Sequence, residues 1–133
     1  MKILTLILGL VFCSHIFAEV KLIDVHQLKQ RIDNPDEILI LLDVRTLKEY
    51  QSGHIKDSIH LPHDQLMLNV DVLDQYRNQP IVVFCRSGRR AQLVIDVLIE
   101  NKFDQIVDLE GDMLAWKHLD SQLFNKFIKR LIY

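Results

Sequence analysis

The fold is decided by the stretch Ile81-Val82-Val83-Phe84-Cys85-Arg86-Ser87-Gly88-Arg89-Arg90. Its first four residues are apolar and match the length of a strand that is buried on both faces. A helical pattern of apolar side chains begins directly afterwards, at Ala91. A buried strand, a short turn and a helix in this order form the repeating unit of parallel α/β sheets. The stretch therefore predicts a strand of such a sheet with Cys85 at its carboxyl end.

The surroundings of Cys85 favour the thiolate form of its side chain. The free N–H groups at the start of the next helix point back toward the sulfur, and the helix dipole adds positive potential there. Because a thiolate is a nucleophile and such a turn also binds anions, we predict that Cys85 attacks an anionic substrate. The alternative, a small buried structural cysteine, fits poorly with three adjacent arginines. The predicted anion-binding loop comprises Arg86, Ser87, Gly88, Arg89 and Arg90.

Apolar runs and helical periodicities alternate along the rest of the chain. This alternation predicts an α/β fold with a mostly parallel central sheet of about five strands and helices on both faces. We expect strands at residues 20–23, 38–42, 58–61, 81–84 and 106–109, and helices at 24–31, 46–50, 64–76, from 91 onward, from 111 onward and at 121–133.

Asp43 follows the apolar run 38–42 and is expected to lie near Cys85, because the carboxyl ends of parallel strands share one edge of the sheet. Two further charged residues, Arg45 and Glu49, come shortly after it. We interpret Asp43, Arg45 and Glu49 as a structural network of ion pairs and helix caps beside the site, with no chemical role of their own.

The first 18 residues have the pattern of a signal peptide. Lys2 supplies the positive start, an apolar run follows it, and Ala18 is a small residue at a suitable cleavage point. We expect cleavage after Ala18 and export, most simply to a periplasm. An uncleaved membrane anchor formed by residues 3–18 is the alternative. Residues 19–133 then form a single domain.

Composition excludes several classes of function. Of the two cysteines, Cys13 lies in the signal segment, so the mature chain cannot form an internal disulfide or act through a dithiol. The formal net charge of −2 provides no basic field for nucleic acid. His60 and His63 lack a third neighbouring ligand, so we predict no metal site. We also expect no cofactor and a monomer.

The tail at residues 121–133 has apolar side chains on one side and Lys126, Lys129 and Arg130 on another, as in an amphipathic helix. We expect it to pack on its own domain. Contact with a membrane surface or a partner is the alternative for a basic amphipathic helix.

With these residues in place, the chain between about residues 20 and 119 resembles a single-domain rhodanese. The run from Cys85 to Arg90 is similar to the family's six-residue active loop. The upstream segments 42–45, 49–50 and 53–55, followed by Pro62, are similar to the family's second signature. The chain departs from the family at Asp57-Ser58, where Gly-Ala is usual, and at Asp112, where a second glycine is common.

The resemblance implies a mechanism. Cys85 would attack the outer sulfur of thiosulfate or a similar small anionic donor, and the resulting persulfide would pass its sulfur to cyanide or a thiol acceptor. Arg90 would close the loop and bind the anion, Arg86 would attract the substrate at the rim, and Arg89 would be solvated.

Two alternatives stay open at this point. A rhodanese-like sulfur carrier or binding module without turnover of its own would keep the same loop. A cysteine-dependent phosphatase is less consistent, because such loops place five residues between the cysteine and the essential arginine, whereas four separate Cys85 from Arg90.

Overall fold

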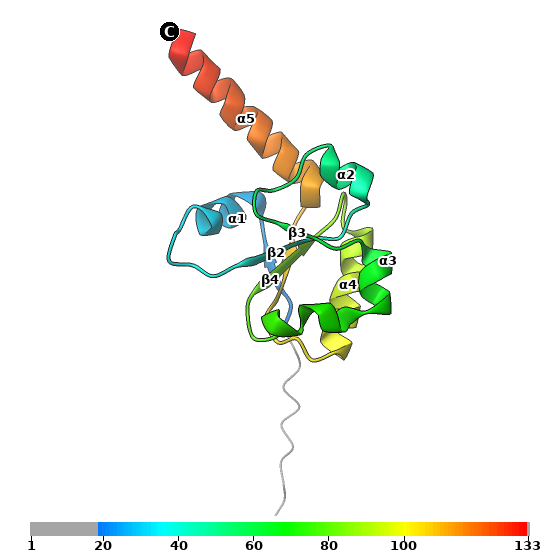
Figure 1. Cartoon of the computed structure of the whole chain (residues 1–133). Coiled ribbons are helices and arrows are strands. Elements are labelled where there is room, and N and C mark those ends of the chain that lie inside the picture. The colour runs from blue at the N-terminus through cyan, green and yellow to red at the C-terminus, as the bar shows by residue number, and fades with distance from the viewer. Residues whose placement is uncertain (1–18, 133) are drawn as a thin grey trace, which may run out of the picture.

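The structure, a computed structural model, describes residues 19–132. Its centre is a sheet of five parallel strands in the order β1-β5-β4-β2-β3 (Figure 1). This confirms the α/β class and the parallel sheet expected from the sequence. The signal segment lies outside the described residues. The strands are β1 (Lys21–Ile23), β2 (Ile40–Asp43), β3 (Ile59–His60), β4 (Ile81–Phe84) and β5 (Ile106–Leu109).

Helices cover both faces of the sheet, as predicted. The helix α1 and the first turns of α5 lie on one face, whereas α3, α4 and a 3₁₀ helix, η1, lie on the other (Figure 1). The remaining helix, α2, lies above the carboxyl ends of the strands (Figure 1). The helices are α1 (Val25–Ile32), α2 (Leu47–Gln51), α3 (His63–Leu68), η1 (Val70–Tyr76), α4 (Arg89–Glu100) and α5 (Asp112–Ile132).

Strand β4 connects the two halves of the core. Because side chains alternate along a strand, Ile81 and Val83 pack under α3 and α4, whereas Val82 and Phe84 pack under α1 and α5. All four side chains are buried, and the strand pairs with β2 on one side and β5 on the other. Strand β4 is therefore fixed on four sides, and the position of the residue after it, Cys85, is fixed with it.

Two helices differ from expectation. The helix expected over residues 64–76 divides into α3 and η1, because Asn69 leaves the helical conformation with φ −153° and ψ 76°. The two helices expected from residue 111 and at 121–133 are one continuous helix, α5. No glycine or proline lies between them, and the Ser121 hydroxyl donates a hydrogen bond to the His118 carbonyl within the helix (2.8 Å).

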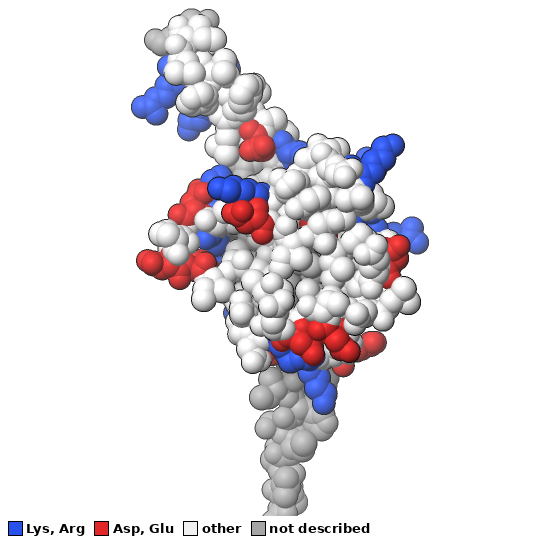
Figure 2. Space-filling view, in the orientation of Figure 1, with Lys and Arg blue, Asp and Glu red and all other residues white. Residues whose placement is uncertain are grey.

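The expectation that the tail packs on its own domain is wrong. Leu119 is the last buried residue of α5, and the helix then projects beyond the domain (Figure 1). Apolar and basic side chains along this projection are both exposed, the basic ones on one side of the helix (Figure 2). The exposed apolar residues are Leu123, Phe124, Phe127, Leu131 and Ile132. Among residues 19–132, no helix is long and apolar enough to cross a membrane.

This arrangement predicts that the tail contributes little to folding. Removal of residues 122–133 should change the free energy of unfolding by less than about 0.5 kcal/mol, because it removes exposed side chains. The matched control is Leu119→Ala, which should lower the same free energy by about 2 kcal/mol or more because that leucine is buried. Chemical denaturation measures both, and a truncated chain that fails to fold would contradict the prediction.

Candidate active site

Cys85 lies at the carboxyl edge of the sheet, directly after β4, and is 1% exposed. The turn that follows brings the chain back over it, because Gly88 adopts a left-handed conformation with φ +100°. As a result the Gly88 N–H donates a hydrogen bond to Cys85 Sγ over 3.1 Å. Gly88 also caps α4, so the start of this helix faces the sulfur as the sequence predicted. The sulfur therefore has a donor that stabilises negative charge on it.

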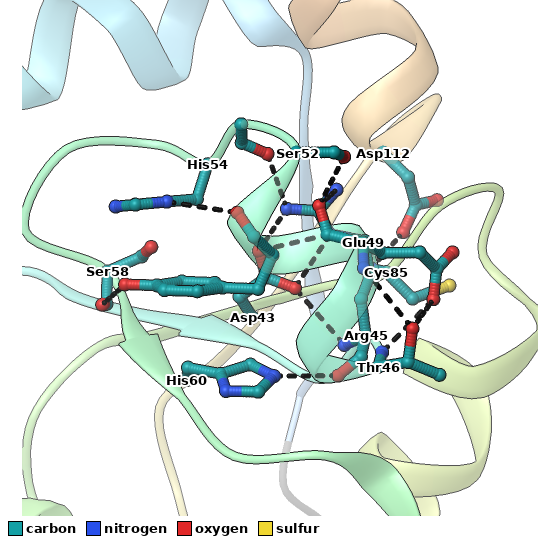
Figure 3. Close-up of polar contacts among 12 residues, drawn as sticks. Asp43, Arg45, Thr46, Glu49, Ser52, His54, Ser58, His60, Cys85 and Asp112 are labelled. Carbon is teal, nitrogen blue, oxygen red and sulfur yellow. Dashed lines mark hydrogen bonds and ion pairs between the residues drawn. The ribbon is translucent and has the colours of Figure 1, made fainter.

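Asp43 and Arg45 form a buried ion pair beside this turn. Both side chains are almost fully buried, and Arg45 Nη2 lies 2.6 Å from Asp43 Oδ2. The same guanidinium donates hydrogen bonds to the carbonyl oxygens of Glu49 (3.2 Å) and Gly53 (2.9 Å). The pair thus holds α2, through Glu49, and the turn that follows this helix above the strand ends (Figure 3). The predicted structural network is present around these two residues.

Glu49 connects α2 to the active loop. Thr46 caps α2, with its N–H and hydroxyl both donating to the Glu49 carboxylate, in a capping box. The same carboxylate accepts two hydrogen bonds from Arg90, at 2.6 Å and 2.8 Å. A bidentate arginine–carboxylate pair fixes both direction and distance. Arg90 is therefore tied across to α2, which agrees with the loop-closing role predicted for it.

The pair strongly affects the ionisation of both partners. The hydrogen bond from Arg90 holds the pKa of Glu49 well below its ordinary value of 4.5. The hydrogen bond to Glu49 raises the pKa of Arg90, and the nearby Cys85 side chain raises it further. Both groups therefore keep their charges over the whole neutral range, and most of the positive charge of Arg90 is compensated by Glu49.

Asp112, at the start of α5, is the residue that sequence reasoning missed. Its side chain reaches the active loop, where Oδ1 accepts a hydrogen bond from the Cys85 N–H over 2.7 Å (Figure 3). Residue Asp112 is 4% exposed, and burial raises the pKa of its carboxyl group. The sequence marked this position only as a departure from a common glycine. An acidic residue after a glycine at a helix start was the available signal.

The other loop side chains face outward. Arg86, Ser87 and Arg89 are exposed, as expected for Arg89. Arg86 also lines a small hollow beside the loop, together with Glu49 and Lys117. The predicted loop residues thus surround Cys85. Of their three cations, Arg90 is paired with Glu49, whereas Arg86 and Arg89 are exposed at the rim.

A family model described as the rhodanese-like domain matches residues 24–119, which include four of the five strands, the loop and the buried part of α5. The chain belongs to the rhodanese-like domain family.

Individual relatives agree with this membership. The chain is 30% identical over 94 residues to YrkF of Bacillus subtilis (strain 168), which is named for sulfur carriage, and the match covers 71% of this chain and 49% of that protein. It is 31% identical over 94 residues to the tRNA uridine(34) hydroxylase of Yersinia enterocolitica serotype O:8, covering 68% of this chain and 26% of that protein. The chain therefore corresponds to half or less of each of these relatives. Among solved structures, a rhodanese-like domain protein from Staphylococcus aureus is 28% identical with a TM-score of 0.64, covering 73% of this chain and 91% of that one.

Aromatic stacking orders the segment that follows α2. The Tyr50 ring lies between His54 and His60, with ring centroids 3.9 Å and 4.5 Å apart. The Tyr50 hydroxyl donates to the Ser58 carbonyl, and His60 Nε2 hydrogen bonds with the Arg45 carbonyl. These histidines therefore hold the segment after α2. Within residues 19–132, no three acidic, histidine or cysteine side chains gather as metal ligands.

The buried Asp43–Arg45 pair makes a strong prediction about stability. Arg45→Met should lower the free energy of unfolding by about 3–5 kcal/mol, because it leaves the Asp43 charge buried without its partner. The control is Lys48→Met, which makes the same chemical change at an exposed position of α2 and should have little effect. Denaturant titration measures both, and equal losses would contradict the structural role of the pair.

The Glu49–Arg90 pair predicts how stability depends on pH. The pKa of Glu49 is lower in the folded protein than in the unfolded chain, so its contribution is fully present above about pH 4.5 and is lost as pH falls below that value. The difference in unfolding free energy between wild type and Glu49→Gln should therefore be constant near neutrality and shrink in acid. Denaturation at a series of pH values measures this difference in unfolding free energy. A difference that grows in acid would contradict the prediction.

Proposed function

We propose that this protein is a sulfurtransferase that carries a sulfane sulfur as a persulfide on Cys85. The observation that supports this most directly is the hydrogen bond from Gly88 N–H to Cys85 Sγ, in a loop that lies within the residues matched by the rhodanese-like family model. The donor is positioned before any substrate binds. Such preorganised donors stabilise developing charge without reorganisation.

The reaction has two steps. Cys85 loses its thiol proton to water, and the thiolate attacks the outer sulfur of a donor such as thiosulfate. The S–S bond of the donor breaks with its electron pair on the leaving sulfite, and an anionic persulfide remains on Cys85. Cyanide or a thiol then takes the outer sulfur and returns the thiolate. No oxidant or cofactor is needed, because each step moves a sulfur atom without net gain or loss of electrons.

A sulfur carrier that delivers the persulfide to a protein partner is the second candidate. The similarity to YrkF, named for sulfur carriage, favours it. A phosphatase fits less well, since the arginine that would bind phosphate, Arg90, already uses both of its terminal nitrogens on Glu49. Export to a periplasm, proposed from residues 1–18, would place either activity outside the cytoplasm.

Intact-mass measurement tests the proposal. The chain from residue 19 onward is incubated with thiosulfate, and separately with the methanethiosulfonate anion, and then with cyanide. We expect a gain of one sulfur atom, its loss on addition of cyanide, and the appearance of thiocyanate. The control Cys85→Ser should gain nothing. No added sulfur on wild type with either donor would overturn the proposal, and a stable persulfide that cyanide does not discharge would favour the carrier.

A further inference from the structure

Asp112 places an acidic group where the proposed reaction builds up negative charge. Its Oδ1 is 2.7 Å from the Cys85 backbone nitrogen, and its Oδ2 lies 3.1 Å from the position that a Cβ atom at Gly88 would occupy. The carboxylate is therefore packed against both residues whose backbone surrounds the sulfur (Figure 3). Burial raises the pKa of this carboxyl group, and the hydrogen bond from the Cys85 N–H offsets part of that effect by favouring the ionised form.

The backbone holds Asp112 in this position firmly. Gly111 and Asp112 both have positive φ, +75° and +52°, and aspartate is one of the few residues that tolerates this region. The next two amides of α5 donate to the active loop, Met113 N–H to the Cys85 carbonyl and Leu114 N–H to the Arg86 carbonyl. Helix and loop thus exchange three hydrogen bonds, and the carboxylate cannot turn away from Cys85 without breaking one of them.

The cations near Cys85 offset this charge only in part, through the effect of Arg90 on the pKa of Asp112. Arg45 is paired with Asp43 and Arg90 with Glu49, and the carboxylate of Asp112 takes part in none of the ion pairs found among residues 19–132. Arg86 and Arg89 are exposed and so are screened by water. The interior of the site is thus less positive than three loop arginines suggest.

We propose that Asp112 determines donor specificity, so that the site favours sulfane sulfur donors with a single negative charge over dianions such as thiosulfate. This inference rests on the proposed sulfur transfer at Cys85. Thiosulfonates and organic persulfides are donors that carry a single negative charge.

The charges of two donors explain why Asp112 disfavours dianions. Thiosulfate brings two negative charges to the Cys85 thiolate, and the products, sulfite and the persulfide, carry the same three charges in total. The methanethiosulfonate anion offers the same outer sulfur bonded to a sulfonyl sulfur, but it brings one charge and leaves as methanesulfinate. A fixed carboxylate beside the sulfur repels the first donor more strongly at every stage, because Coulomb energy scales with the product of the charges.

Steady-state kinetics with these two donors tests the inference. For wild type, Asp112→Asn and Asp112→Gly, kcat/KM is measured with thiosulfate and with methanethiosulfonate, using cyanide as acceptor. Asparagine keeps an acceptor for the Cys85 N–H and removes only the charge, whereas glycine suits the positive φ and removes the side chain. The matched control is Asp120→Asn, the same change at an exposed position of α5.

Both Asp112 variants should improve the use of thiosulfate relative to methanethiosulfonate by about ten-fold, whereas Asp120→Asn should leave the ratio unchanged. The thiosulfate gain should come mainly from a lower KM. A ratio that stays at the wild-type value in both variants, with persulfide still forming on Cys85, would overturn the inference and leave the sulfur transfer intact. Failure of both donors to load wild-type Cys85 would instead remove the function on which it rests.

The pH dependence of the ratio of the two kcat/KM values shows whether the charge of Asp112 or the shape of its side chain sets the donor preference. Burial raises the pKa of Asp112, whereas hydrogen bonds from Cys85 and the charge of Arg90 lower it in part, and Asp112 in turn raises the pKa of Asp108. As pH falls from neutrality into the acid range, protonation of Asp112 begins earlier than for an ordinary aspartate, so wild type should accept thiosulfate progressively better relative to the monoanion. Ionisation of Cys85 affects both donors and cancels in the ratio. In Asp112→Asn the ratio should be flat, and a parallel slope in that variant would contradict the assignment to Asp112.

Discussion

Asp43 and Arg45 form an ion pair that water does not reach, and the position of the whole upper edge of the site follows from it. The guanidinium is held by Asp43 at the end of β2, and from there it binds carbonyl oxygens at Glu49 and Gly53. Because Glu49 lies within α2 and Gly53 follows the end of this helix, the pair fixes the second half of α2 and with it Glu49. Glu49 in turn holds Arg90 and with it the first turn of α4. A charge buried in the sheet thus positions a loop on the neighbouring strand.

A second set of contacts reaches the same loop from the other side. The start of α5 accepts a hydrogen bond from Cys85 and donates two to the loop carbonyls. The turn after β4 is therefore held by α2 on one side and by α5 on the other. Cys85 itself is 1% exposed. In the proposed sulfur transfer, this burial favours small donors that fit beside the loop.

Sequence reasoning located the parts of this arrangement that depend on local pattern. The buried run before Cys85 and the helices expected at 24–31 and 46–50 rest on patterns within a few residues, and each is present. The break at Asn69 and the continuity of α5 were missed, since a helical pattern does not show where one residue leaves it. Glu49 was predicted as a structural residue near the site, but its partner Arg90 lies 41 residues away, and no local pattern encodes that distance.

Asp112 is a second residue that local sequence could not place near Cys85. Its negative charge opposes the positive charge that the sequence around Cys85 indicates. Three arginines after a cysteine predict a strongly positive pocket. In the folded protein, that positive charge is smaller than the local sequence indicates. One arginine is neutralised by Glu49, two are in water, and a carboxylate from a helix more than twenty residues further along is placed against the cysteine instead. Local sequence therefore predicts the nucleophile, whereas the charge that the nucleophile experiences is set by residues brought in from elsewhere. Since Coulomb energy depends on every charge within reach, donor preference in this site follows from the packing of α5 on the loop as much as from the loop itself.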